Sequence, residues 1–310
     1  MAKPRNRVVD YGVYLVIRIV GAFLRTLPFA LAFRVADGLA WVLMRISRSR
    51  IDIARDNLRQ AFPGRYSEAE LGRLVAETYR HFCRVIVEVL HIEHVMRTDN
   101  WRDFLSFGTD DQCRDVIAAL VSGRSVMMVT GHFGNWEIAG YVLALLGFRG
   151  CAIARPLDNS HLDRWLRRWR EATGQKLIAK NGEFELIEKT LQNGGILATL
   201  GDQDAGQRGL FVPFFNRPAS THKAVALLAL EHKPIMVVVG AARIGVGMSY
   251  CLYIEDIIDP LDYEKRPDAV KAITVRFTEA LERMIRRHPE QYLWIHRRWK
   301  HQPPAKKKAA

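Results

Sequence analysis

The sequence predicts an α/β fold with a mixed, largely parallel central sheet flanked by helices. Three observations support this. From Ser125 onward, short apolar runs rich in β-branched residues alternate with longer helical segments. The chain has 310 residues, of which 49% are hydrophobic, enough for a large buried core. No internal repeat or long low-complexity linker divides it.

The first apolar region covers residues 11–46. Arg18, Arg25, Arg34 and Asp37 interrupt it, so no stretch reaches the roughly 18 uncharged residues of a clear membrane-spanning helix. Arg18 and Arg25 are spaced to share one helical face with Tyr11 and Tyr14, and apolar side chains cover most of the remaining surface. This pattern is typical of a helix lying in a membrane interface, and the alternative is a core helix with two exposed arginines. No small-residue cleavage site follows, so we expect residues 1–50 to attach the protein to a membrane from its cytoplasmic face.

A long helix is expected next, over residues 67–96, because Ser67 and Glu70 form a capping-box pattern ahead of a periodic apolar run. We expect it to pack beside the sheet. The elements predicted downstream are strands at 125–130, 151–154, 176–179, 196–200, 235–240 and 249–254, and helices at 138–148, 160–171, 184–192, 219–232 and 269–287.

The segment Gly-His-Phe-Gly-Asn-Trp-Glu at 131–137 is the strongest candidate for a catalytic motif. It lies between a predicted buried strand and a predicted core helix, at the strand end where open α/β sheets bind ligands. A histidine becomes an effective general base when a carboxylate holds one ring nitrogen and stabilises the imidazolium, so we predict that Glu137 orients His132. The alternative is an ordinary, hydrogen-bonded structural histidine. No serine or cysteine stands in a nucleophile-elbow pattern, so a substrate hydroxyl is the expected nucleophile.

Further polar residues follow other predicted strands. Asp202, Gln203 and Asp204 come directly after the strand at 196–200, where they point into the same crevice. One acidic group is expected to bind a sugar hydroxyl and the other to hold Arg155 or Arg208. Arg155 precedes a proline and is suited to gripping a phosphate or carboxylate, unless it forms a structural ion pair. Two carboxylates without further ligands are weak evidence for a metal, so we assign none.

Two segments leave alternatives open. The aromatic and aliphatic residues of the loop at 207–220 are expected either under the domain or against acyl chains and membrane. The helix at 160–171, with Trp165 and Trp169 among arginines, is expected to pack as an amphipathic helix whose basic face suits an acidic protein or lipid headgroups. His296 and its neighbouring arginines close the active-site side or cap the fold.

The strongly positive charge of the chain favours negatively charged partners. The net charge is +13, which favours anionic lipid, phosphorylated substrate, an acidic protein or nucleic acid. Nucleic acid is the weaker alternative because no zinc finger, RNP-like strand or helix-turn-helix pattern is present. The 4 cysteines lie far apart and indicate reduced thiols. A basic tail at 301–310 is expected to be solvated or to touch anionic lipid.

Five sequence blocks give this chain a family resemblance. The 131–137 motif resembles the H-x4-D/E motif of glycerolipid-type acyltransferases, and more closely that of the bacterial lipid A late acyltransferase family. Segments similar to the family's other blocks occur in the same order, at 55–63, 154–159, 201–206 and 289–300.

The resemblance implies a glycerolipid acyltransferase-like catalytic domain at 51–300 with His132 as general base and Glu137 as the residue that orients it. Substrate contacts are expected from the blocks at Asn135, Arg155, Asn159, Asp202, Gln203, Asp204 and Arg208. The family's usual donor is an acyl-acyl carrier protein thioester, and its usual acceptor is a hydroxyl of a phosphorylated, Kdo-bearing lipid A precursor, an anionic glycolipid. Related members acylate phosphatidylinositol mannosides from acyl-CoA. The resemblance also implies that the protein is attached to the cytoplasmic face of a bacterial inner membrane, either peripherally or through one N-terminal helix. It implies no cofactor.

Overall fold

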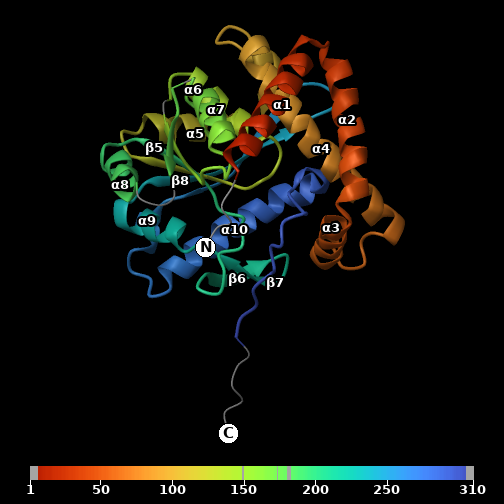
Figure 1. The fold of residues 1–310 in the computed structure, drawn as a ribbon. Helices are drawn as coiled ribbons and strands as arrows, with labels where there is room; N and C mark the ends of the chain where they lie inside the picture. Colours follow the sequence, from red (N-terminus) through yellow and green to blue (C-terminus); the bar gives the residue numbers. More distant parts are fainter. Residues whose placement is uncertain (1–5, 149, 173, 180–182, 305–310) are drawn as a thin grey trace.

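A seven-stranded sheet forms the centre of the computed structural model, which describes residues 6–148, 150–172, 174–179 and 183–304 (Figure 1). The strand order is β1-β9-β8-β2-β5-β3-β4, and every neighbouring pair is parallel except the antiparallel pair β8–β9. The predicted mixed, largely parallel sheet is therefore confirmed. The strands are β1 (Leu105–Phe107), β2 (Val126–Thr130), β3 (Gly150–Ala154), β4 (Lys176–Ala179), β5 (Ile196–Leu200), β8 (Ile235–Arg243) and β9 (Tyr250–Ile258).

Helices cover both faces of the sheet. Successive side chains of β2 point to opposite faces, so Met127 and Val129 join one buried cluster while Val126 and Met128 join the other. The first cluster is completed by α8 (Phe184–Gln192), α9 (Ala224–His232) and α10 (Ala269–Arg287), and the second by α5 (Asp110–Val121) and α6 (Trp136–Leu145). A strand buried on both faces reads as a continuous apolar run, which is why β2 was recognisable in the sequence.

The helix α4 (Glu68–Val95) links the N-terminal region to the sheet. Its capping box is present, because Ser67 Oγ accepts from the Glu70 N–H and the Glu70 carboxylate accepts from the Ser67 N–H. The helices α1 (Arg7–Thr26), α2 (Phe29–Ile46) and α3 (Arg48–Ala61) all pack against α4, and α1 also contacts α7 (Ser160–Glu171). Figure 1 shows α1, α2 and α4 grouped at one side of the molecule.

Two arginines of α1 contact neighbouring side chains of the protein, although both remain solvent-exposed. Arg18 Nη1 donates to the Tyr14 hydroxyl (3.3 Å) and the Arg18 guanidinium lies over the ring of Trp165 in α7, while Arg25 contacts His94 of α4. Many large apolar side chains of α1 and α2 are exposed as well; they are Val8, Val9, Tyr11, Val13, Leu15, Val16, Ile17, Ile19, Val20, Phe23, Leu31, Val35, Leu39, Trp41, Val42 and Ile46. Within the described ranges, no helix is both long enough and apolar enough to cross a membrane.

The predicted helix over 219–232 was wrong at its start. Residues 217–221 form β7 (Arg217–Thr221), which pairs with β6 (Leu210–Phe214) in a separate antiparallel hairpin, and α9 begins only at Ala224. Phe215 and Asn216 at the turn both have positive φ, as a tight two-residue hairpin requires. Val212, Phe214 and Phe215 are buried in the core, so these loop residues lie under the domain.

The carboxyl ends of β2 and β5 meet at one edge of the sheet. The two strands are adjacent and parallel, and their last residues, Thr130 and Leu200, are register partners. The Gly201 N–H donates to the Thr130 carbonyl (2.8 Å), which continues the pairing beyond the strands. The 131–137 motif and Asp202 therefore leave the sheet side by side. Short 3₁₀ turns also lie at Trp101–Asp103, Pro260–Tyr263 and Pro289–Gln291.

Candidate active site

The turn between β2 and α6 is fixed by its backbone. Gly134 adopts φ +57°, and a Cβ there would lie 2.0 Å from the Ala241 carbonyl oxygen, so only glycine fits. Asn135 follows as the N-cap of α6, and its side-chain oxygen accepts from the Ile138 N–H (3.3 Å). The carboxyl-terminal segment closes the other side, because the Leu293 N–H donates to the His132 carbonyl (3.1 Å) and the Gly134 N–H to the Gln291 carbonyl (2.9 Å).

Asp202 holds His132 through two hydrogen bonds. One carboxylate oxygen accepts from His132 Nδ1 (2.9 Å) and the other from the His132 backbone N–H (2.9 Å). The Asp202 side chain is buried, whereas the His132 side chain is 21% exposed. Gly131 permits this approach, because a Cβ at that position would lie 3.2 Å from Asp202 Cβ and Cγ. A buried carboxylate thus fixes an accessible imidazole.

The hydrogen bonds determine the tautomer of His132. A carboxylate only accepts, so the proton of the neutral ring is on Nδ1 and the lone pair is on Nε2. That lone pair faces the side-chain amide of Gln203 (3.4 Å). Burial alone would lower the pKa of His132, but the charge and hydrogen bond of Asp202, together with the charge of Glu137, raise it above its ordinary 6.5. Burial likewise opposes ionisation of Asp202, yet His132 and Arg298 lower its pKa. The pair is arranged to stabilise a protonated imidazole.

Glu137 does not occupy the position predicted for it. Its carboxylate accepts from Arg170 Nε (2.9 Å) and Nη2, in a fork-to-fork pair with α7, and from Trp136 Nε1 (3.1 Å). The carboxylate predicted to accept from the His132 ring is therefore corrected from Glu137 to Asp202. The reason is geometric: β5 delivers Asp202 directly beside β2, whereas the first turn of α6 aims Glu137 at α7. The Trp136 ring packs edge-on against His132, with centroids 5.1 Å apart.

Two residues expected to contact substrate are helix caps. Asn135 is buried and donates its Nδ2 to Glu88 (2.7 Å) while capping α6. Asn159 is buried, accepts from the first N–H groups of α7 at His161 (3.0 Å) and Leu162 (3.2 Å), and donates to the Asp10 carbonyl (2.8 Å). Both amides are occupied by the protein, so the contacts that the structure shows for them position helices.

The remaining predicted residues lie apart from one another. The Arg155 side chain is 83% exposed and pairs with Asp158 (3.6 Å), and Arg208 is also exposed. Asp204 does not hold either arginine, because His301 Nδ1 bonds its Oδ2 (2.6 Å) and its N–H donates to His296 Nε2 (3.2 Å). The carboxylates of Asp202 and Asp204 therefore bind different histidines, His132 and His301. Elsewhere among the described residues, Glu188, Glu231 and His232 bring possible ligand atoms within 4.8 Å of one another on α8 and α9.

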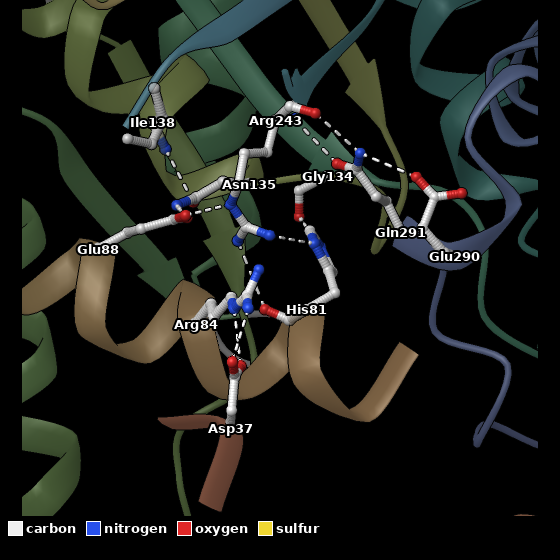
Figure 2. A network of polar contacts seen from close by, with 10 residues as sticks. All are labelled: Asp37, His81, Arg84, Glu88, Gly134, Asn135, Ile138, Arg243, Glu290 and Gln291. Atoms are coloured by element: carbon white, nitrogen blue, oxygen red, sulfur yellow. Dashed lines mark hydrogen bonds and ion pairs between the residues drawn. The ribbon is translucent and has the colours of Figure 1, made fainter. Parts of the chain in front are cut away.

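Three site residues were not found by sequence reasoning: Glu88, His81 and Arg243. They form a buried polar network directly behind the 132–135 turn (Figure 2). A signal was present, because Glu88 interrupts the apolar run Val85–Leu90 and lies seven residues from His81, on the same helical face. Burying a charged residue on an apolar helix face is costly unless it is paired, so the pattern around Glu88 predicts a buried partner of opposite charge.

A cavity of about 230 Å³ lies between α1, α4 and α7. Apolar side chains form most of its wall, and Arg25, Glu93 and Arg168 are its charged members; the others are Val89, Leu90, Trp165, Leu166, Trp169 and Ala172. Val89 and Glu93 share one face of α4 with Ile86, which is exposed, and Phe82, whose ring is 6.0 Å from that of Trp136. This face therefore extends from the catalytic turn to the cavity.

Known proteins similar to this chain agree on one chemistry. The family described as bacterial lipid A biosynthesis acyltransferase matches residues 2–301. A lipid A biosynthesis palmitoleoyltransferase of Escherichia coli is 30% identical over 262 residues, covering 83% of this chain and 80% of that protein. A lipid A biosynthesis lauroyltransferase of the same organism is 26% identical over 281 residues, covering 89% and 88%. A phosphatidylinositol mannoside acyltransferase of Mycobacterium tuberculosis is 24% identical over 186 residues, covering 59% and 57%.

Proposed function

The chain belongs to the bacterial lipid A biosynthesis acyltransferase family and is an O-acyltransferase, and from this premise we propose its donor, acceptor and catalytic residues. The proposed reaction moves a fatty acyl chain from an acyl-acyl carrier protein thioester to a hydroxyl of a lipid A precursor. The observation that supports it best is the His132–Asp202 pair, because the partly exposed His132 Nε2 is engaged by a long contact with the Gln203 amide (3.4 Å) that a substrate hydroxyl would replace. That arrangement suits removal of a proton from a hydroxyl.

The proposed mechanism is direct transfer. The acceptor hydroxyl donates to His132 Nε2, which takes its proton as the oxygen attacks the thioester carbonyl. The carbonyl π electrons move to oxygen, and the resulting tetrahedral oxyanion lies beside the N-terminus of α6, whose partial positive charge stabilises it. Collapse re-forms the carbonyl, breaks the carbon–sulfur bond and releases a thiolate, which takes the proton from the imidazolium. Asp202 stabilises the imidazolium between the two proton transfers.

Glu137 keeps a supporting part in this proposal. Its charge adds to that of Asp202 in raising the pKa of His132. Its pair with Arg170 also joins the motif to α7, the helix that presents the exposed Arg164 and Arg168. An acidic carrier protein bound to that basic face would deliver its thioester next to the catalytic turn. The net charge of +13 favours such a partner and a phosphorylated acceptor alike.

The acyl chain is proposed to follow the apolar face of α4 from Trp136 to the cavity between α1, α4 and α7. A bulkier side chain in that cavity should then shorten the preferred donor. Leu166→Trp is expected to favour a shorter acyl chain over a longer one, as measured by competition between two carrier-bound donors. An unchanged preference would place the chain elsewhere.

Membrane association is the third part of the proposal. The outward-facing apolar side chains of α1 and α2 form a surface that water disfavours and that a lipid interface would cover. Contact of this surface with a membrane would bring the enzyme close to its lipid acceptor. We therefore propose that the protein lies peripherally on the cytoplasmic face of a bacterial inner membrane, with α1 and α2 in contact with lipid.

The function is tested by acyl transfer in mixed micelles. Labelled acyl-acyl carrier protein, and in parallel acyl-CoA, are offered with a Kdo-bearing tetraacyl lipid A precursor and, in separate reactions, with phosphatidylinositol mannoside. Transfer by the wild type is expected to disappear in His132→Ala and to persist in His232→Ala, the same change on α9. Transfer from acyl-CoA alone would replace the proposed donor, transfer to phosphatidylinositol mannoside alone would replace the acceptor, and full activity of folded His132→Ala would rule out the proposed base.

A further inference from the structure

A buried ion pair lies behind the catalytic turn. Arg243, the last residue of β8, binds Glu88 of α4 through its Nε, and their side chains are 6% and 0% exposed. Glu88 also accepts from Asn135 Nδ2 (2.7 Å), so the pair is connected to the N-cap of α6. Figure 2 shows these groups converging from α4, β8 and the turn. Loss of one partner would leave the other charge buried and unpaired, which strongly destabilises the folded protein. The contact between Glu88 and Arg243 is therefore maintained in the folded state.

His81 connects the same pair to the peptide of Gly134. A carbonyl oxygen only accepts, so His81 Nε2 donates to the Gly134 oxygen (3.0 Å). His81 Nδ1 must then accept, and it receives Arg243 Nη1 (3.0 Å). The ring is therefore neutral, with its proton on Nε2. Burial and the adjacent Arg243 charge agree with this, because they lower the pKa of His81 to about 3.

Gly134 is thereby held from three directions. Its carbonyl is bound by α4 through His81, its N–H donates to the Gln291 carbonyl (2.9 Å), and its Cα faces Ala241 of β8 at close range. The Gln291 side chain bonds the Arg243 backbone in both directions, at 2.8 Å and 2.9 Å. The turn thus has little freedom to move relative to the sheet.

We infer that Glu88, Arg243 and His81 are positioning residues for acyl transfer, which fix Gly134 and Asn135 and so aim His132 at the acceptor hydroxyl. The expected effect on the rate of transfer rests on the proposed function. None of the three side chains contacts Asp202 or the Nε2 face of His132 in the hydrogen bonds of the described chain. Their effect should fall on the rate of transfer rather than on substrate binding, because small displacements of a catalytic group cost about 10²-fold in rate.

The test compares His81→Phe, His81→Gln and Asp37→Asn. Phenylalanine keeps the ring but removes both polar contacts, and glutamine restores a donor toward the Gly134 carbonyl. Asp37→Asn is the matched control, because it weakens the Arg84–Asp37 pair (2.7 Å), which joins α4 to α2 one turn from His81. With equal folded fractions confirmed by thermal unfolding, His81→Phe should lower kcat about 10- to 100-fold with KM nearly unchanged. His81→Gln should recover most of the loss, and Asp37→Asn should keep the wild-type kcat.

A second readout needs no substrate. Amide hydrogen exchange of residues 132–138 should accelerate in His81→Phe but not in Asp37→Asn. If the wild type transfers no acyl chain, the proposed function fails and the exchange data alone decide this inference. Wild-type kcat and exchange in folded His81→Phe would overturn it. Should that variant not fold, Arg243→Lys, which cannot hold Glu88 and His81 together, is expected to lose about tenfold in kcat; if neither folds, the network serves stability and the positioning role is rejected.

Discussion

The N-terminal helices and the carboxyl edge of the sheet break the rule of apolar inside and polar outside in opposite ways. On α1 and α2, large apolar side chains such as Val16 and Ile19 are exposed. At the sheet edge, Asp202, Glu88 and Arg243 are buried. The first exception exposes surface that only another apolar phase would cover, and the second immobilises charge next to an accessible histidine. Each exception costs stability, and each lies where we propose contact with a substrate or a membrane.

The largest expected effect is at the buried edge. Asp202→Asn should lower kcat by about 10³- to 10⁴-fold, because the amide no longer fixes the proton of His132 on Nδ1. Steady-state acyl transfer measures this, with Glu137→Gln as the matched change of the second carboxylate. We expect a smaller loss for Glu137→Gln, since it reaches His132 only through its charge. Equal losses would remove the distinction between the two carboxylates.

One chemical change made in both regions should separate them in stability. Phe277 of α10 is 0% exposed and Phe23 of α1 is 58% exposed. Phe277→Ala should therefore lower the free energy of unfolding by about 3–5 kcal/mol. Phe23→Ala should change it by less than about 0.5 kcal/mol. Urea unfolding of both variants in the same buffer gives the comparison, and similar losses would show that Phe23 is covered by protein.

Charge placed on the outward face of α1 should weaken membrane binding and leave the chemistry intact. Val16→Asp/Ile19→Asp should reduce binding to anionic vesicles more than about tenfold, because each buried aliphatic side chain contributes about 1.5–3 kcal/mol. Vesicle co-sedimentation measures the binding, and kcat in micelles should be unchanged. Val246→Asp, at a more exposed position between β8 and β9, is the control. Undiminished vesicle binding by the double variant would refute the proposed orientation.

The smallest effect is a shift in pH dependence. The base must be unprotonated, and the pKa of His132 is raised above 6.5, so kcat/KM should fall as the pH drops through a value above 6.5. The residual activity of Asp202→Asn should show this limb at lower pH, because the charge that stabilises the imidazolium is gone. A pH profile of each protein measures it; a midpoint that does not move would show that Asp202 orients His132 without affecting its charge.

Most of the sheet was predictable because its strands are short, apolar and buried on both faces. The predicted helices over Ser160–Glu171, Phe184–Gln192 and Ala269–Arg287 match α7, α8 and α10 in type and bounds. The strand β1 was missed because three residues give no periodic pattern. The sequence predicts a helix from residue 219 because residues 219–221 are continuous with the apolar run that follows, and only pairing with β6 makes them part of a strand. Of the tail predicted at 301–310, residues 305–310 lie outside the described residues.

The site was predictable as a place but not as a set of contacts. His132 and Asp202 each follow a strand, yet the pairing of β2 with β5 that brings them together depends on the whole sheet. The spacing of five residues in the motif suggests Glu137 as the partner of His132. Such local spacing carries no information on Asp202, which comes from a neighbouring strand. The contacts of Arg18 with Trp165 and of Arg25 with His94 were equally hidden, because the sequence of a helix does not show which other helix lies beside its polar face.

The bonds from residues 291–293 to the catalytic turn have a consequence for the order of biosynthesis. His132 and Gly134 are paired with Leu293 and Gln291, which lie more than one hundred and fifty residues later in the chain. Translation proceeds from the N-terminus at about 5–20 residues per second, so α1 and α2 emerge many seconds before the turn can be completed. The apolar helices for which we propose membrane contact are therefore synthesised before the catalytic centre can be completed, so the proposed contact with lipid can precede activity.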